Sequence, residues 1–168
     1  MKSVFFRCLI LAILSIGCSA SEAIEQAQPI PDCQLTTFGT SDSFNLKQYQ
    51  GKVVYVDFWA SWCAPCAKSF PFLNTLNKAY KEQGLTIIGV NLDENTPDAD
   101  NFLAKVPPEF SIASDSQNQQ CAQDFGVKAM PSSYIIDRKG VVRHIHLGFK
   151  PGETDEIIAL VKSLLAEP

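Results

Sequence analysis

Positive charge is scarce in this sequence. Its 168 residues include 14 Lys and Arg against 18 Asp and Glu, which gives a formal net charge of −4. Removal of Lys2 and Arg7 with an N-terminal leader leaves 12 basic against 18 acidic residues, a net charge of −6. A protein that binds nucleic acid needs a basic surface to meet the phosphates. The charge balance therefore argues against a nucleic-acid partner.

Long apolar runs, repeats and metal-ligand patterns are also missing. Beyond the first twenty residues, no apolar run reaches the length of about 18 residues that a membrane-spanning helix needs. Only Cys63 and Cys66 are spaced like half of a zinc site, and a structural zinc needs four ligands. We therefore expect no metal and no other cofactor. A content of 46% hydrophobic and 19% charged residues indicates one globular domain.

The first twenty residues are expected to form a signal peptide with a lipobox region, outside the fold. A basic start precedes an apolar stretch at residues 8–16. That stretch is too short for a comfortable membrane span and is typical of an export leader. Residues 21–30 are then expected to be a tether, and residues 31–168 one folded domain.

The end of the leader has three interpretations. Leu14-Ser15-Ile16-Gly17-Cys18 resembles a bacterial lipobox, which predicts lipidation of Cys18 and a lipid anchor at the periplasmic face of the envelope. Cys18-Ser19-Ala20 also fits ordinary signal cleavage, and an uncleaved anchor is the third alternative. All three predict export. Ser19, where an Asp would hold a lipoprotein at the inner membrane, leaves the outer membrane open.

The most informative stretch is Trp62-Cys63-Ala64-Pro65-Cys66. It follows an apolar run at residues 52–59, which is typical of a strand buried on both faces, and it opens a helical pattern at residues 64–83. The N-terminus of a helix favours a thiolate, and Cys-X-X-Cys on a helix sets the sulfurs about one turn apart. The pair can therefore cycle between dithiol and disulfide.

The remaining pattern predicts an α/β domain. Strand and helix signals alternate along the chain and end in a hairpin and a closing helix, which favours a central mixed β-sheet with helices on both faces. The expected strands cover residues 33–38, 44–46, 85–92, 110–113, 132–137 and 140–147, and the further helices cover 96–105, 117–125 and the segment from 151 on.

These features together resemble the thioredoxin superfamily, and within it the TlpA/ResA-like branch of membrane-tethered, exported thioredoxins. The resemblance covers residues 30–165. The segment between residues 92 and 110 corresponds to the strand-helix segment that this branch inserts into the thioredoxin-like fold. The residues that carry the resemblance are Gly51 to Val54, Asp57 to Cys66, Phe70-Pro71, Gly126 to Pro131 and Ile136 to Gly140.

The resemblance implies a thiol–disulfide oxidoreductase that acts on partner proteins. Cys63, partly exposed beside Trp62, would attack a partner disulfide, and Cys66 would resolve the mixed disulfide. Met130-Pro131 resembles the cis-proline loop, whose backbone would pair with an extended partner segment. The favoured direction is reduction, with electrons from a membrane thiol donor. An oxidase or isomerase is the alternative within the same class.

Two positions depart from the branch in a related way. Asp57 lies in the apolar strand where the branch commonly has Asn, and Ser69 lies where many members have Glu. An unpaired buried carboxylate has a raised pKa and could accept and return the proton of Cys66. Our hypothesis is that the catalytic carboxylate has moved from the helix to the strand. The alternative is a carboxylate satisfied by a neighbouring donor, with no catalytic part.

Cys33 and Cys121 stand where the family usually has apolar residues. They could be two buried free thiols that act as small hydrophobic residues. They could also form a second disulfide that ties the first strand to the body of the domain. The sequence leaves both alternatives open.

His144 and His146 alternate with apolar residues on the last expected strand, so they share one face. Exported copper chaperones of this fold bind the metal with two cysteines and a histidine, which makes a copper-binding assembly factor the rival function. Their cysteines are further apart than Cys63 and Cys66, and their histidine has a different context, so a solvated strand face is the better explanation of His144 and His146. Met130-Pro131-Ser132-Ser133 also lacks the Pro-Glu-Thr-Phe form of the dedicated cytochrome c maturation members.

Overall fold

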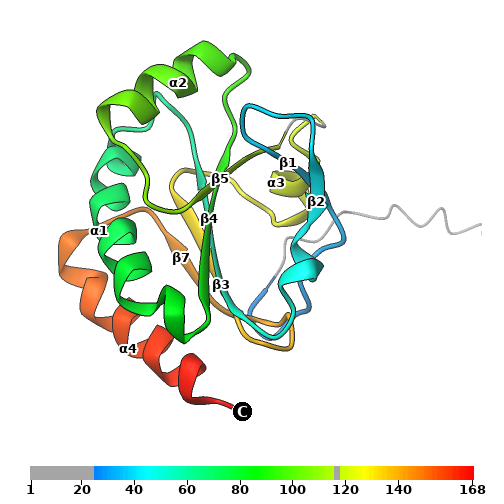
Figure 1. Cartoon of the computed structure of the whole chain (residues 1–168), viewed down its shortest axis with the longest axis vertical. Helices are drawn as coiled ribbons and strands as arrows, with labels where there is room; N and C mark the ends of the chain where they lie inside the picture. The colour runs from blue at the N-terminus through cyan, green and yellow to red at the C-terminus, as the bar shows by residue number, and fades with distance from the viewer. Residues whose placement is uncertain (1–24, 116–117) are drawn as a thin grey trace, which may run out of the picture.

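The computed structural model describes residues 25–115 and 118–168, so Cys18 and the rest of the expected leader lie outside the described residues. Seven strands form one mixed sheet in the order β2-β1-β5-β4-β3-β6-β7 (Figure 1). The strands are β1 (Gln34–Thr37), β2 (Ser43–Asn45), β3 (Val53–Trp59), β4 (Leu85–Asn91), β5 (Ser111–Ser114), β6 (Ser132–Ile136) and β7 (Val142–Leu147). The helices are α1 (Ala64–Tyr80), α2 (Thr96–Lys105), α3 (Gln120–Asp124) and α4 (Thr154–Ala166), with 3-10 turns η1 (Leu46–Tyr49), η2 (Lys81–Gln83) and η3 (Pro151–Glu153).

Strand β3 is the centre of the sheet. All seven of its residues are buried, as its apolar sequence predicts for a strand covered on both faces. It pairs in parallel with β4 and antiparallel with β6. The active-site stretch follows β3 directly, so the most buried strand positions it.

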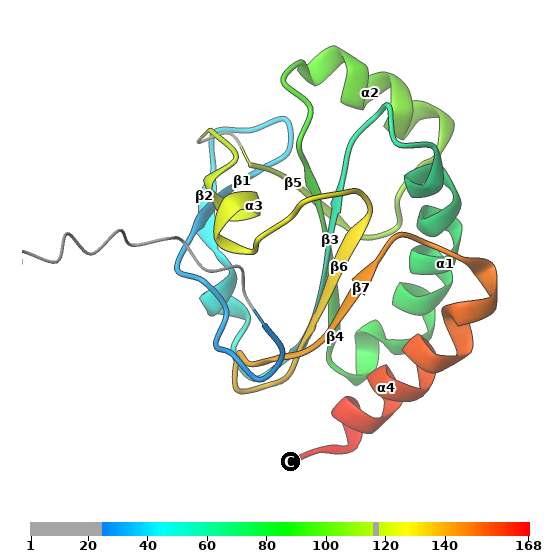
Figure 2. The same ribbon diagram turned by 180° about the vertical axis from the view of Figure 1, so that it is seen from behind.

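Helices cover both faces of the sheet, which confirms the predicted fold class. Helices α1 and α4 lie along one face, and α3 lies on the other (Figures 1 and 2). On the first face, the cluster of buried residues includes Leu73 of α1, Val161 of α4 and Tyr55 of β3. On the second, Phe125 packs on Phe58 with ring centroids 5.3 Å apart.

Helix α2 packs beside the end of β3 where the cysteines follow. The Phe102 ring lies 4.8 Å from that of Trp59 and 5.2 Å from that of Phe70, measured between centroids. The expected insertion at residues 92–110 therefore contains a helix, and the strand β5 begins just after it. No helix in the described ranges 25–115 and 118–168 is long and apolar enough to cross a membrane.

Most element boundaries lie within one or two residues of the sequence expectation, and three differences have a clear structural cause. Helix α1 stops at Tyr80, and η2 follows before Gly84, whose φ of 103° ends the helical segment. Helix α3 begins only at Gln120, because Gln119 before it has a left-handed φ of 56°. At the N-terminus, Ile30 is buried and its N–H donates to Gly140, so the last residues of the expected tether contact the domain.

Candidate active site

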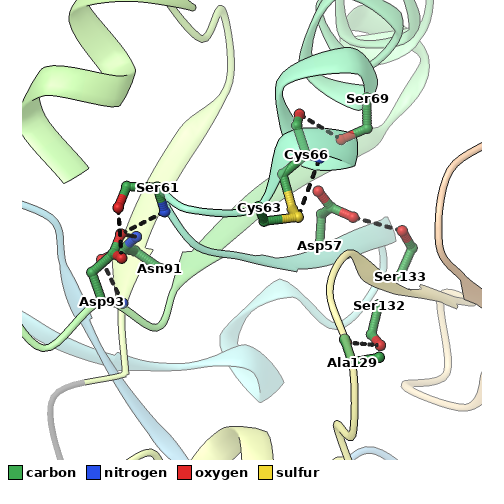
Figure 3. Close-up of a disulfide and its surroundings, with 10 residues drawn as sticks. All are labelled: Asp57, Ser61, Cys63, Cys66, Ser69, Asn91, Asp93, Ala129, Ser132 and Ser133. Atoms are coloured by element: carbon green, nitrogen blue, oxygen red, sulfur yellow. Dashed lines mark hydrogen bonds between the residues drawn. A yellow bond between two sulfur atoms is a disulfide. The ribbon is translucent and has the colours of Figure 1, made fainter. Parts of the chain in front are cut away.

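Cys63 and Cys66 form a disulfide at the start of α1, with Cα atoms 5.3 Å apart. Cys63 is the N-cap of the helix, and its Sγ accepts a hydrogen bond from the Cys66 N–H at 3.2 Å (Figure 3). Donation to that sulfur stabilises a thiolate on Cys63 once the disulfide is reduced. Pro65 lies in the first turn, where a missing N–H costs no hydrogen bond.

The first cysteine is less exposed than its expected role suggests. Cys63 is only 4% exposed and Cys66 is fully buried, because both pack into a cluster with Trp59, Phe70 and other apolar side chains. The exposed group is instead the neighbouring Trp62, at 72%. A partner would therefore meet the indole first and the sulfur beneath it.

The loop between β3 and the active-site cysteines is held by a network of polar side chains. This network was not predicted from the sequence. The Ser61 N–H and hydroxyl both donate to the carboxylate of Asp93 at 2.8 Å, and Asn91 donates to the same carboxylate at 2.7 Å (Figure 3). The signal was available, because Asn91 ends the parallel strand β4 and Asp93 follows it. Residues at the carboxyl ends of neighbouring parallel strands meet at one edge of the sheet.

Asp57 lies close to the Cys63–Cys66 disulfide (Figure 3). It is fully buried, and Oδ1 accepts a hydrogen bond of 2.6 Å from the Ser133 hydroxyl. Oδ2 has no hydrogen-bond partner among the described residues, and Figure 3 shows this second oxygen on the side of Cys66. Burial raises the pKa of Asp57 to about 7, against the Ser133 hydrogen bond, which lowers it. Such a group can both take and return a proton near neutral pH.

Ser69, at the position where many members of the branch have Glu, provides no carboxyl group. The Ser69 hydroxyl donates a hydrogen bond to the Cys66 carbonyl oxygen at 3.0 Å. This bond satisfies the polar group of the buried Ser69 side chain. The carboxylate partner Ser133 was missed from the sequence. It could have been found from strand register, because Ser133 is the direct antiparallel neighbour of Asp57.

The Met130–Pro131 peptide bond is cis. The Met130 side chain packs against the cluster that contains both active-site cysteines, so the loop lies beside them. Two hydrogen bonds fix the loop: Ser132 Oγ donates to Ala129 O at 2.7 Å, and Gly148 N–H donates to Pro131 O at 2.8 Å. The structure thus brings the sequence-predicted loop and the cysteines together.

An open groove of about 310 Å³ lies beside the first cysteine, between the active-site loop and α2. Trp62, Ala64 and Phe102 give it apolar walls, and Asp98 and Lys105 add charge on the α2 side. A side chain of a partner could enter this groove while its disulfide approaches Cys63.

The structure places Cys33 and Cys121 in a disulfide, with Cα atoms 5.2 Å apart. Both residues are buried in the core cluster on the α3 face of the sheet. The bridge connects the start of β1 to α3 over a sequence separation of 88 residues. It lies apart from the Cys63–Cys66 pair, in a different cluster.

Loss of the Cys33–Cys121 bridge is expected to destabilise the fold without stopping thiol exchange. Cys33→Ala/Cys121→Ala should lower the free energy of unfolding by about 2–5 kcal/mol, because closure of a long loop restricts the unfolded chain. Urea unfolding measures this. The matched control is Cys63→Ala/Cys66→Ala, whose separation of three residues predicts a much smaller loss. Equal losses of unfolding free energy in the two double variants would contradict a specific stabilising role of the Cys33–Cys121 disulfide.

His144 and His146 stack on one face of β7 with ring centroids 6.1 Å apart. They are not joined by a third ligand: within residues 25–115 and 118–168, no group of three or more His, Cys, Asp or Glu could hold a metal ion. Nothing in the described geometry brings these histidines to the cysteines as a copper ligand set.

Several similar proteins are named as thiol-disulfide oxidoreductases or thioredoxin-like proteins. The Redoxin family model matches residues 25–160. The thiol-disulfide oxidoreductase ResA of Bacillus cereus is 33% identical over 148 residues, covering 83% of this chain and 84% of that protein. The thioredoxin-like protein YneN of Bacillus subtilis is 32% identical over 128 residues, covering 74% and 73%.

A solved structure gives the same assignment. A Chlorobium tepidum protein named as a thiol:disulfide interchange protein DsbE is 40% identical with a TM-score of 0.80, covering 86% of this chain and all of that one. The TM-score of 0.80 shows that the two chains share their fold. The chain therefore belongs to the Redoxin family, in the TlpA/ResA-like branch of the thioredoxin superfamily.

Proposed function

We propose that this protein is an exported thiol–disulfide oxidoreductase that reduces selected disulfides in partner proteins. Protein thiol–disulfide exchange is the activity of its family, as the ResA and DsbE relatives indicate. The observation that carries the proposal for this chain is the Cys63–Cys66 disulfide at the N-cap of α1, where the helix N–H groups stabilise a sulfur anion. The buried acid Asp57 beneath it supplies the proton chemistry.

Each cycle transfers two electrons from the protein to its partner. The Cys63 thiolate attacks one sulfur of the partner disulfide, which forms a mixed disulfide and releases the other partner sulfur as a thiolate. Cys66 then attacks Cys63 Sγ, which frees the second partner thiol and closes the Cys63–Cys66 disulfide. The Cys66 proton must leave as its sulfur becomes nucleophilic, and Asp57 accepts it at Oδ2.

The surface around Cys63 suits an extended peptide. Trp62 offers an exposed aromatic surface on one side, and the groove against α2 accepts a side chain. The Met130-Pro131 loop lies beside the cysteines, and its backbone can pair with the partner as an added strand would. Partners with an apolar residue next to the attacked cystine would fit this surface.

The proposed location is the periplasmic face of the cell envelope, with a lipid on Cys18. The leader pattern supports export, and the ResA and DsbE relatives support an extracytoplasmic site. An oxidising compartment would convert the active cysteines to their disulfide. Reduction of partners there requires a continuous electron supply, so we include a membrane thiol donor in the proposal.

The redox state of the two cysteine pairs in the native envelope tests direction and location together. Cells are quenched with acid, free thiols are alkylated with a maleimide, and the modified peptides are identified by mass spectrometry. We expect Cys63 and Cys66 to be largely alkylated, while Cys33 and Cys121 in the same molecules stay protected as a disulfide. The second pair is therefore an internal control for the oxidising compartment.

Two results would overturn parts of the proposal. Protection of both pairs would indicate an oxidase, because an oxidase keeps its active disulfide formed. Alkylation of all four cysteines would indicate a reducing compartment and contradict export.

A further inference from the structure

A row of polar side chains crosses three neighbouring strands, from the buried active site to the surface. Asp57 on β3 is paired in register with Ser133 on β6, and Ser133 is paired with His146 on β7. Directly opposed residues of antiparallel strands point to the same face, with Cβ atoms about 4.5–5.5 Å apart. The three side chains therefore lie next to one another on the face covered by α1 and α4.

Burial decreases step by step along this row. Asp57 is 0% exposed, Ser133 is 3% exposed, and the side chain of His146 is 13% exposed. Glu153, whose side chain is 36% exposed, lies beyond the imidazole, with Oε2 3.3 Å from His146 Nε2. That imidazole nitrogen is buried and has no hydrogen-bond partner in the part of the chain that the structure describes, so it remains available to accept or donate one.

On the side of Asp57 that faces β4, away from Ser133, none of the described side chains could take up a proton. There the register neighbour is Gly89, and a methyl group on it would lie 3.0 Å from Ile112 Cδ1 and 3.1 Å from the Phe110 ring. The Trp59 indole N–H, at 3.2 Å from the same point, is a donor only and cannot take up a proton. Apolar side chains thus close the side of the carboxylate away from Ser133.

We propose that Ser133 and His146 carry the proton of Asp57 to solvent, which makes the row a built-in proton exit for the resolving step. The inference rests on the proposed function, in which Asp57 accepts the Cys66 proton. Ser133 and His146 act through Asp57 and are positioning residues for this transfer.

The transfer balances without any change in oxidation state. The carboxyl group, protonated at Oδ2, turns about its Cβ–Cγ bond and gives that proton to Ser133 Oγ, while the Ser133 hydroxyl proton passes to the imidazole of His146. One S–H bond at Cys66 is lost and one N–H bond at His146 is gained. The imidazole then releases the proton to water beside Glu153.

Other titratable groups face the two ends of the row. Near Asp57 lies Tyr55, whose pKa is raised by burial and then by the charge of Asp57, against a side-chain hydrogen bond with Ser133, which lowers it. The rise prevails, so the Tyr55 hydroxyl keeps its proton. His146 is faced by His144 on the same strand and by Glu153, which is also paired with Lys150 at 3.3 Å. The pKa of His144 is lowered by burial and by His146, against the charge of Glu156 on α4, which raises it.

The test follows the resolving step alone. A glutathione mixed disulfide is formed on Cys63, and glutathione release by Cys66 is measured by rapid acid quench between pH 5 and 9. We expect His146→Ala to slow release about tenfold at pH 7, with recovery on addition of imidazole as an external proton carrier. The matched control is His144→Ala, which removes the stacked histidine outside the row and should behave as the wild type.

Ser133 variants separate a relay from a merely structural role. Ser133→Ala should slow release and move the pH inflection upward, because the hydrogen bond that lowers the pKa of Asp57 is lost. Ser133→Thr keeps the hydroxyl and should retain the wild-type profile. If His146→Ala matches His144→Ala at every pH and ignores imidazole, the proton exit is wrong. If wild-type protein never releases glutathione, the proposed function itself fails.

Discussion

Cys63→Ser is expected to lose insulin-disulfide reduction by at least about 10³-fold, because a serine hydroxyl is not ionised at neutral pH and cannot replace the thiolate nucleophile. The wild-type sulfur lies at the N-cap of α1, where it accepts the Cys66 N–H. Turbidity of reduced insulin, with dithiothreitol as electron donor, measures the rate. The serine variant should keep its fold, since the side chains differ little in size.

Two companion variants locate the effect in the active pair. Cys66→Ser should retain the first attack but stall as a mixed disulfide, because no resolving thiol remains. Cys33→Ala/Cys121→Ala should reduce insulin at the wild-type rate under conditions where it is folded, since that bridge lies in another cluster. Activity that survives Cys63→Ser would contradict the assignment of the nucleophile.

Asp57→Asn is expected to slow resolution by Cys66 about 10-fold to 100-fold at pH 7. Asparagine keeps the shape of the side chain but cannot take the thiol proton. In the wild type, resolution should accelerate as the pH rises through about 7, where the carboxyl loses its own proton. The variant should lack this inflection and approach the wild-type rate only at high pH, where Cys66 ionises by itself. Stopped-flow release from a Cys63 mixed disulfide gives both profiles.

The same substitution should stabilise the protein in a pH-dependent way. The folded-state pKa of Asp57 is raised from 3.8 to about 7, so the native state binds a proton that the unfolded state releases. Stability from this group is complete below pH 4 and is lost as the pH rises from about 4 to about 7. Asp57→Asn removes that loss and should raise the free energy of unfolding by about 2–4 kcal/mol at pH 8, with little change from this term at pH 4. Urea unfolding at the two pH values measures the difference.

Asp115→Asn is the matched control for the kinetic effect. Asp115 is also buried with a raised pKa, owing to burial, but it accepts the Ala122 N–H at α3 and does not lie beneath the active cysteines. Its substitution should leave the kinetic profile unchanged. If Asp57→Asn resolves the mixed disulfide at the wild-type rate with the wild-type pH profile, Asp57 has no part in catalysis. It would then be only a buried carboxylate that the Ser133 hydrogen bond satisfies.

Local sequence was sufficient to predict the centre of the fold. The apolar run of β3, the helix start at Ala64 and the hairpin of β6 and β7 each carry their signal within a few residues. The Met130–Pro131 loop and the burial of Asp57 followed from the family resemblance and the strand pattern. The strand expected at residues 110–113 is β5 in the structure. It lies between β1 and β4, and pairing on both sides outweighs the low intrinsic strand propensity of its sequence.

Contacts between distant segments were beyond the sequence pattern. Ser133 meets Asp57 across 76 residues, and the Asp93 carboxylate meets Ser61 across 32. The approach of Cys33 to Cys121 depends on how β1 and α3 pack, so spacing alone could not decide between a disulfide and two free thiols. The row that ends at His146 exists only in the register of β6 and β7.

The most direct test of the central claim is peptide mapping of the Cys66→Ser protein after incubation with a disulfide-containing peptide. We expect one covalent adduct per molecule, at Cys63, with Cys33 and Cys121 recovered as their own disulfide. The adduct should be released by dithiothreitol. Absence of an adduct, or an adduct at Cys33 or Cys121 with Cys63 unmodified, would contradict an active site built on Cys63 and Cys66.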